Sequence, residues 1–131
     1  MPFVLESDET EILMGTDKGP NATEALLHAL ASCLNTTFIY HASARGIKID
    51  KLELSLEGTI DLRGMLGLEE GVRNGFHRID VTIRIKSDAP PEKLKELCRL
   101  AEKHSPVFDI VTNPVPVELK IEIDQPITVA I

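Results

Sequence analysis

The chain has 131 residues and a mass of 14.4 kDa, which predicts one domain, residues 1–131, around a single hydrophobic core. Acidic residues outnumber basic ones by 21 to 14, so the formal net charge is −7. No cluster of Lys or Arg stands out that would release counterions from a phosphate backbone. Nucleic acid is therefore excluded as an expected partner.

The beginning of the chain, MPFVLESDETE, lacks both the basic and the apolar region of a signal peptide. The longest apolar stretch, residues 25–44, contains several polar side chains and is too polar for an unassisted membrane span. We therefore expect a cytoplasmic protein that has no membrane partner.

A long helix is predicted over residues 22–45. Asn21 and Glu24 have the spacing of a capping box at its start, and Gly46 suits the left-handed position after its end. Its apolar residues go nearly all the way round, and a helix of this kind must be enclosed on every side. We interpret it as the central helix of the fold, covered by a sheet and by a second copy of itself.

Alternation of apolar and polar residues predicts strands over residues 47–62, 78–87 and 115–123. The segment 63–77 between the first two strands carries Gly at positions 64, 67, 71 and 75, which points to a mobile loop.

Two further helices are predicted before the last strand. The first covers residues 88–104, and its inner stripe comprises Leu94, Leu97, Ala101 and His104. The second covers residues 105–113, with Ser105 as N-cap and Pro106 in the first helical position. This order of elements predicts an α+β fold with a largely antiparallel sheet.

The two cysteines, Cys33 and Cys98, lie 65 positions apart without a metal-binding or disulfide spacing, so we interpret them as separate thiols. A free cysteine with a pKa of ~8.5 is only roughly 3 % thiolate at pH 7, so a reactive thiol needs a cation or donor nearby. No neighbour of Cys33 on its own helix supplies a permanent cation. A reactive thiol and a buried, inert one both remain open for Cys33, whereas Cys98 is expected to be structural.

Glu24 is the carboxylate that shares the long helix with Cys33. Nine residues at ~100° each place it on the opposite face, so a capping role and a catalytic role both remain open.

No metal or nucleotide cofactor is expected. The four histidines (His28, His41, His77 and His104) show no metal-ligand spacing. The glycines of residues 64–75 lack the Gly-Lys-Ser/Thr ending of a phosphate loop.

The segments GTDKGPNATEALLHALASC, LEGTIDLRGMLGL, GFHRIDVTIRI and HSPVFDIVTNPVPV occur in that order. They resemble the OsmC/Ohr family of osmotically inducible and organic hydroperoxide resistance proteins over about residues 15–123. The resemblance implies an OsmC-like fold, in which a long central helix packs on the sheet and two chains form an intertwined homodimer. Active members of the family reduce organic hydroperoxides with a cysteine thiolate, which an arginine and a glutamate activate. A second cysteine resolves the sulfenic acid, and a dithiol such as a lipoyl group returns the electrons.

By this resemblance, Cys33 is the attacking cysteine and Glu24 is the acidic residue. Two departures follow from the same comparison. Ser105 stands where the family has its second cysteine, and a hydroxyl cannot form the disulfide. Cys98 stands seven residues earlier, about 10 Å along a helix, which makes it a poor substitute. The strand that carries the activating arginine precedes the equivalent of residues 2–15 in the family, and none of the arginines here sits in a matching motif.

Two hypotheses remain. In the first, the chain is a stress protein and a one-cysteine thiol peroxidase that an external thiol resolves. In the second, it is a non-catalytic dimer whose apolar cleft binds a small hydrophobic ligand or serves only the structure. A third, weaker hypothesis is a protein-interaction module that uses the glycine-rich loop.

Overall fold

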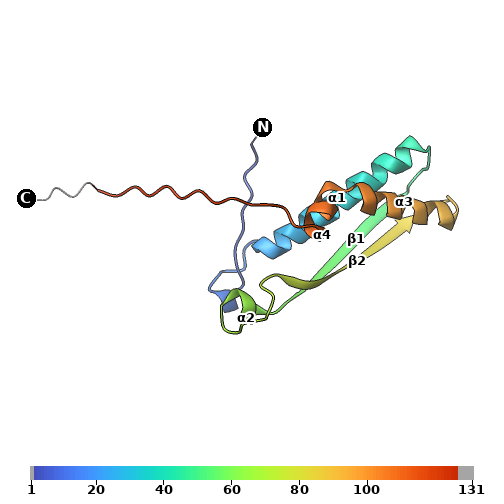
Figure 1. Cartoon of the computed structure of the whole chain (residues 1–131). Coiled ribbons are helices and arrows are strands. Elements are labelled where there is room, and N and C mark those ends of the chain that lie inside the picture. The colour runs from blue at the N-terminus through green and yellow to red at the C-terminus, as the bar shows by residue number, and fades with distance from the viewer. Residues whose placement is uncertain (1, 127–131) are drawn as a thin grey trace, which may run out of the picture.

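The computed structural model describes residues 2–126, in which helices and one antiparallel sheet form a single body with an extended C-terminal arm (Figure 1). In chain order the elements are the 3-10 helix η1 (Glu11–Leu13), α1 (Ala22–Ala44), β1 (Lys51–Ile60), α2 (Leu62–Met65), β2 (Phe76–Lys86), α3 (Pro91–His104) and α4 (Pro106–Thr112). Helices together with an antiparallel pair of strands confirm the predicted α+β class.

Helix α1 begins and ends where its capping residues predict. The Asn21 side chain accepts a hydrogen bond from the Glu24 backbone N–H at 2.8 Å, and the Glu24 carboxylate accepts one from the Asn21 N–H at 3.1 Å. Gly46, which follows the C-cap Arg45, has a φ of +65°. These local signals need no tertiary contact, which is why the sequence predicts the helix well.

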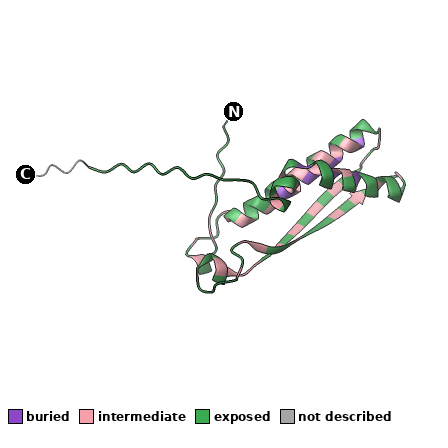
Figure 2. Cartoon of the chain, in the orientation of Figure 1, coloured by how far each residue is buried: buried purple, intermediate pink, exposed green. Residues whose placement is uncertain are grey.

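The core lies where α1 meets β1, α3 and α4. One stripe of α1 is buried, and it recurs at every fourth residue, as the purple segments of Figure 2 show: Leu30, Leu34, Phe38 and Ala42. Helix α3 adds Leu97 and Ala101, which are 0 % and 1 % exposed. The four-residue spacing places one face of α1 against the rest of the fold.

The sheet turns its aliphatic face toward this core. In the antiparallel register, Leu52 pairs with Ile85 and Leu54 pairs with Ile83. Leu52, Leu54 and Ile85 pack against the buried cluster, whereas alternate residues such as Glu53 are exposed. The period-2 pattern therefore confirms both strands, with bounds that differ from the predicted ones by up to four residues at the start and two at the end.

The predicted last strand, residues 115–123, is wrong for the single chain. This segment runs away from the body without pairing to any other part of residues 2–126 (Figure 1). Its apolar residues are exposed, Val117 and Ile121 at 80 % and Leu119 at 90 %. Alternation gives a segment strand character, but a strand also needs a neighbour to take its backbone hydrogen bonds.

Two smaller expectations also need correction. The loop expected over residues 63–77 is shorter in the structure, because α2 extends to Met65 and β2 begins at Phe76. Asp61 caps α2 by accepting a hydrogen bond from the Arg63 N–H at 3.1 Å. His104 does not belong to the buried stripe of α3, because it is exposed and its ring stacks on that of His41 at 5.1 Å between centroids. No helix within the described part of the chain is long and apolar enough to cross a membrane.

Candidate thiol site and adjoining groove

The structure brings Cys33 and Ser105 together, although they lie 72 residues apart in the sequence. The Ser105 hydroxyl donates a hydrogen bond to the Cys33 Sγ at an O–S distance of 3.0 Å. Cys33 lies in the middle of α1 and is half-buried, while Ser105 is only 1 % exposed. The contact therefore forms at the inner side of α1, where the junction between α3 and α4 meets it.

The direction of the Ser105 hydroxyl is set by helix α4. As the predicted N-cap, Ser105 accepts a hydrogen bond at its Oγ from the Phe108 backbone N–H at 3.2 Å. This bond occupies an oxygen lone pair and leaves the single hydroxyl proton to point at the sulfur. A hydroxyl donor aimed at the sulfur fixes the direction of the Cys33 side chain and offers a hydrogen bond to negative charge that develops on the sulfur.

Glu24 does not join this pair in the single chain. It lies nine residues before Cys33, about 13 Å along the helix axis, and both its carboxylate and its N–H serve the capping box with Asn21. Its catalytic role stays a prediction.

Cys98 remains a separate free thiol on α3, partly buried against the core. Burial raises the pKa of its thiol, and the neighbouring positive charge of Arg99 only partly opposes the shift. A thiol that burial holds in the neutral form is a poor nucleophile, in agreement with the structural role expected for Cys98.

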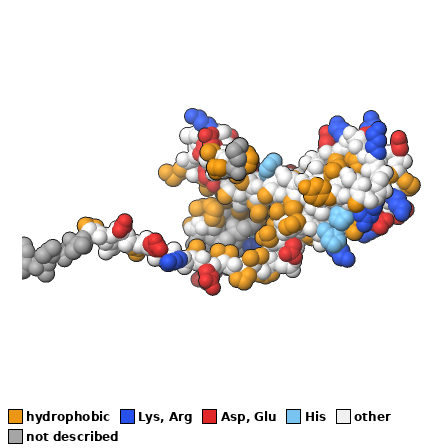
Figure 3. Space-filling model, turned by 90° about the horizontal axis from the view of Figure 1, so that it is seen from above, with side chains coloured by type: hydrophobic (Ala, Val, Ile, Leu, Met, Phe, Trp, Pro, Cys, Tyr) orange, Lys and Arg blue, Asp and Glu red, His pale blue; other side chains and the backbone are white. Residues whose placement is uncertain are grey.

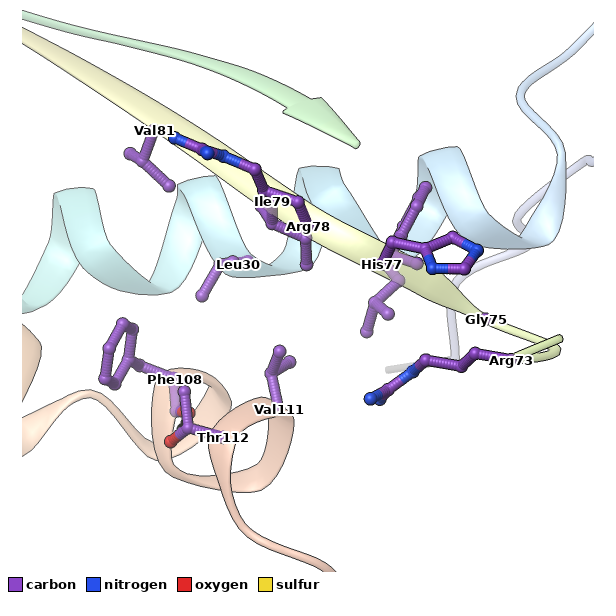
Figure 4. Close-up of a pocket in the computed structure, with 12 residues that line it drawn as sticks. Leu30, Arg73, Gly75, His77, Arg78, Ile79, Val81, Phe108, Val111 and Thr112 are labelled. Carbon is purple, nitrogen blue, oxygen red and sulfur yellow. Dashed lines mark hydrogen bonds between the residues drawn. The ribbon is translucent and has the colours of Figure 1, made fainter. Parts of the chain in front are cut away.

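A groove of about 530 Å³ adjoins the thiol site, between α1, the start of β2 and α4. Figure 4 shows Leu30 on α1 facing Phe108 and Val111 on α4, with Ile79 and Val81 of β2 above them. Seen from above, apolar side chains gather across the middle of the molecule, and charged ones crowd one end of it (Figure 3). Cys33 does not line the groove, but two neighbours of the thiol site, Leu30 and Phe108, do.

The groove also brings in residues that carry no signal in the sequence, notably Arg73 and His77. Arg73 belongs to the glycine-rich segment, and its place at the groove depends on how that segment packs on α2. Phe108 and Val111 carry a weak signal, since their spacing puts them on one face of the short helix α4.

Comparison with known proteins gives a consistent result. Residues 15–120 match the family described as OsmC-like protein. The sequence matches no curated protein.

Several solved structures share the fold. An OsmC-like protein of Mycoplasma pneumoniae is 26 % identical, with a TM-score of 0.66 over 76 % of this chain and 67 % of that one. An organic hydroperoxide resistance protein OsmC of Legionella pneumophila is 15 % identical, with a TM-score of 0.63 over 82 % and 72 %. The organic hydroperoxide resistance protein OhrB of Bacillus subtilis is 23 % identical, with a TM-score of 0.51 over 81 % and 73 %. The family match over most of the chain, together with this shared fold, shows that the protein belongs to the OsmC-like family.

Proposed function

We propose that this protein acts in the response to organic hydroperoxides and reduces them with Cys33 as its single attacking thiol. The observation that carries the proposal is the 3.0 Å hydrogen bond from Ser105 to the Cys33 sulfur. Two structural neighbours are named organic hydroperoxide resistance proteins, which supports the same class of substrate.

The reaction follows from the chemistry of a thiolate. The Cys33 sulfur attacks the terminal oxygen of the hydroperoxide, the O–O bond breaks, and the alkoxide leaves as an alcohol after taking a proton. The sulfur is thereby oxidised to a sulfenic acid. Throughout this step the Ser105 hydroxyl donates a hydrogen bond to the sulfur and orients it.

Resolution needs a thiol from outside the chain, because Ser105 offers oxygen where a disulfide needs sulfur. One external thiol condenses with the sulfenic acid, releases water and forms a mixed disulfide. A second thiol attacks that bond, releases the oxidised reductant and restores Cys33. A small dithiol supplies both groups. A reducing compartment such as the cytoplasm fits this cycle, since Cys33 and Cys98 are both free.

A homodimer is part of this proposal. The single chain leaves exposed apolar side chains on α1, with Tyr40 at 69 %, and on the arm, with Leu119 at 90 %. In this proposal a second copy covers these surfaces, and its residues bring to Cys33 the activating cation and the carboxylate that the described chain does not place there.

The alternative is a non-catalytic protein that binds a hydrophobic ligand. One observation favours this alternative: the structure contains an apolar groove of about 530 Å³, and Cys33 is not among the residues that line it. Reaction of a hydroperoxide with the Cys33 sulfur distinguishes the two functions, because only the catalytic one requires it.

The test is steady-state consumption of cumene hydroperoxide with a small dithiol as reductant. We expect turnover well above the rate of the dithiol alone, loss of that turnover in Cys33→Ser, and its retention in Cys98→Ser as the matched control. Turnover that survives in Cys33→Ser, or no turnover in the wild type, contradicts the proposal.

A further inference from the structure

The groove beside the thiol site has an apolar interior. Its aliphatic and aromatic lining comes from α1, β2 and α4 and includes Leu26, Leu30, Phe76, Ile79, Phe108 and Val111. A volume of about 530 Å³ lies in the range of small-molecule sites, which combine an apolar lining with a few polar groups that fix orientation. The interior therefore suits the hydrocarbon part of a ligand.

The charge of the groove is opposite to that of the protein. Its described lining contains Arg73, His77 and Arg78 and no acidic residue, although the chain as a whole carries a formal charge of −7. Positive groups at one end of an apolar surface complement an amphipathic anion.

Arg73 is the cation that is free to bind such an anion. Arg78 is paired with Asp80 at 2.7 Å, and Arg63 is paired with Asp61 and Glu69. Within residues 2–126, no carboxylate lies within ion-pair distance of the Arg73 guanidinium. In Figure 4 its side chain runs along the mouth of the groove toward Val111 of α4.

The backbone that carries Arg73 is held in place by α2. A Cβ atom on Gly64 would lie 2.6 Å from the Arg73 carbonyl oxygen and 2.7 Å from that of Val72. Only glycine allows this approach of backbone to backbone. The packing of residues 72–73 on α2 therefore sets where the Arg73 side chain begins.

We infer that the groove binds an amphipathic organic anion, whose hydrocarbon chain lies on the apolar lining and whose oxyanion pairs with Arg73. Leu30 and Phe108 lie beside both the thiol site and the groove, so a hydroperoxide with an anionic tail would be held with its apolar part near Cys33. Only this consequence of the inference rests on the proposed function. Binding itself needs no reaction at the sulfur.

The test is calorimetric titration of the Cys33→Ser protein with decanoate, decyl phosphate and 1-decanol. An exposed charge-assisted hydrogen bond predicts about tenfold tighter binding of decanoate than of decanol. Added salt should remove most of that difference. Arg73→Gln should reduce decanoate binding to the level of decanol and leave decanol unchanged. Arg84→Gln is the matched control, because Arg84 points to the outer face of the sheet toward Ser55, and it should change neither affinity.

Equal affinity for decanoate and decanol, or decanoate binding that survives Arg73→Gln, overturns the inference. Absence of binding by all three ligands also overturns it, and sedimentation of the same sample then shows whether a second copy occupies the groove. Decyl phosphate distinguishes a general oxyanion site from one that accepts carboxylates alone. Because cumene hydroperoxide is uncharged, its reduction reports on Cys33 independently, so failure of this inference and failure of the proposed function give different results.

Discussion

Removing the Ser105 hydroxyl should slow the reaction of Cys33 with a hydroperoxide, because the sulfur then loses the donor that orients it. A hydrogen bond to a charged acceptor contributes about 1.5 kcal/mol at the low end of its range. The sulfur keeps about half of its negative charge in the transition state, so removing the hydroxyl should raise the barrier by about half of this contribution. We therefore predict that Ser105→Ala reacts about threefold more slowly than wild type.

The assay is the single-turnover rate of both proteins with cumene hydroperoxide, measured at neutral pH under the same conditions. The substitution also removes the N-cap of α4, at a cost of about 1 kcal/mol of folding stability. Asp61→Ala, which removes the N-cap of α2 instead, is the control for that loss. Equal rates of wild type and Ser105→Ala, or the same slowdown in Asp61→Ala, would refute the reasoning about the hydrogen bond.

Three further predictions concern the site and its support. Ser105→Cys should give a protein that loses two hydrogen atoms after one equivalent of hydroperoxide, because the new sulfur replaces an oxygen 3.0 Å from the Cys33 Sγ; gain of one oxygen without that loss contradicts the geometry. Leu97→Ala should lower the free energy of unfolding in urea by about 2–5 kcal/mol, since Leu97 is fully buried; a change below about 1 kcal/mol contradicts its place in the core. Hydrogen bonds from the Thr16 hydroxyl and from backbone N–H groups lower the pKa of Asp8 from 3.8 to about 2. Its contribution to stability should therefore be complete above about pH 4 and be lost as the pH falls through about 2. Titration of the Asp8 carboxyl carbon by NMR checks this, and a midpoint near 3.8 contradicts it.

Local signals account for the parts of the fold that the sequence predicts well. Helix α1 follows from Asn21, Glu24 and Gly46, each of which acts on backbone groups within a few residues of itself. The α4 N-cap at Ser105 is equally local. The alternation over residues 115–123 is just as clear, but a strand also needs a partner, and this segment pairs with no strand within residues 2–126.

The candidate site was predictable only in part. The residue types of Cys33 and Ser105 are read directly, and the family resemblance predicts that they correspond to two cysteines that react together. Their 3.0 Å contact depends on how α3 and α4 cross α1, which no spacing in the sequence encodes. The position of Arg73 depends on the close packing of Gly64 against the backbone of residues 72–73, and the sequence of this segment does not show how it folds back on itself.

The central claim is that Cys33 is an activated thiol that works without an internal partner. Its most direct test is the intact mass of the reduced protein after exposure to one equivalent of an organic hydroperoxide, beside the Cys33→Ser and Cys98→Ser variants. We predict a rapid gain of one oxygen atom that requires Cys33 and does not require Cys98. Loss of two hydrogen atoms that requires both cysteines, or no change on the timescale of a free thiol, would contradict the account.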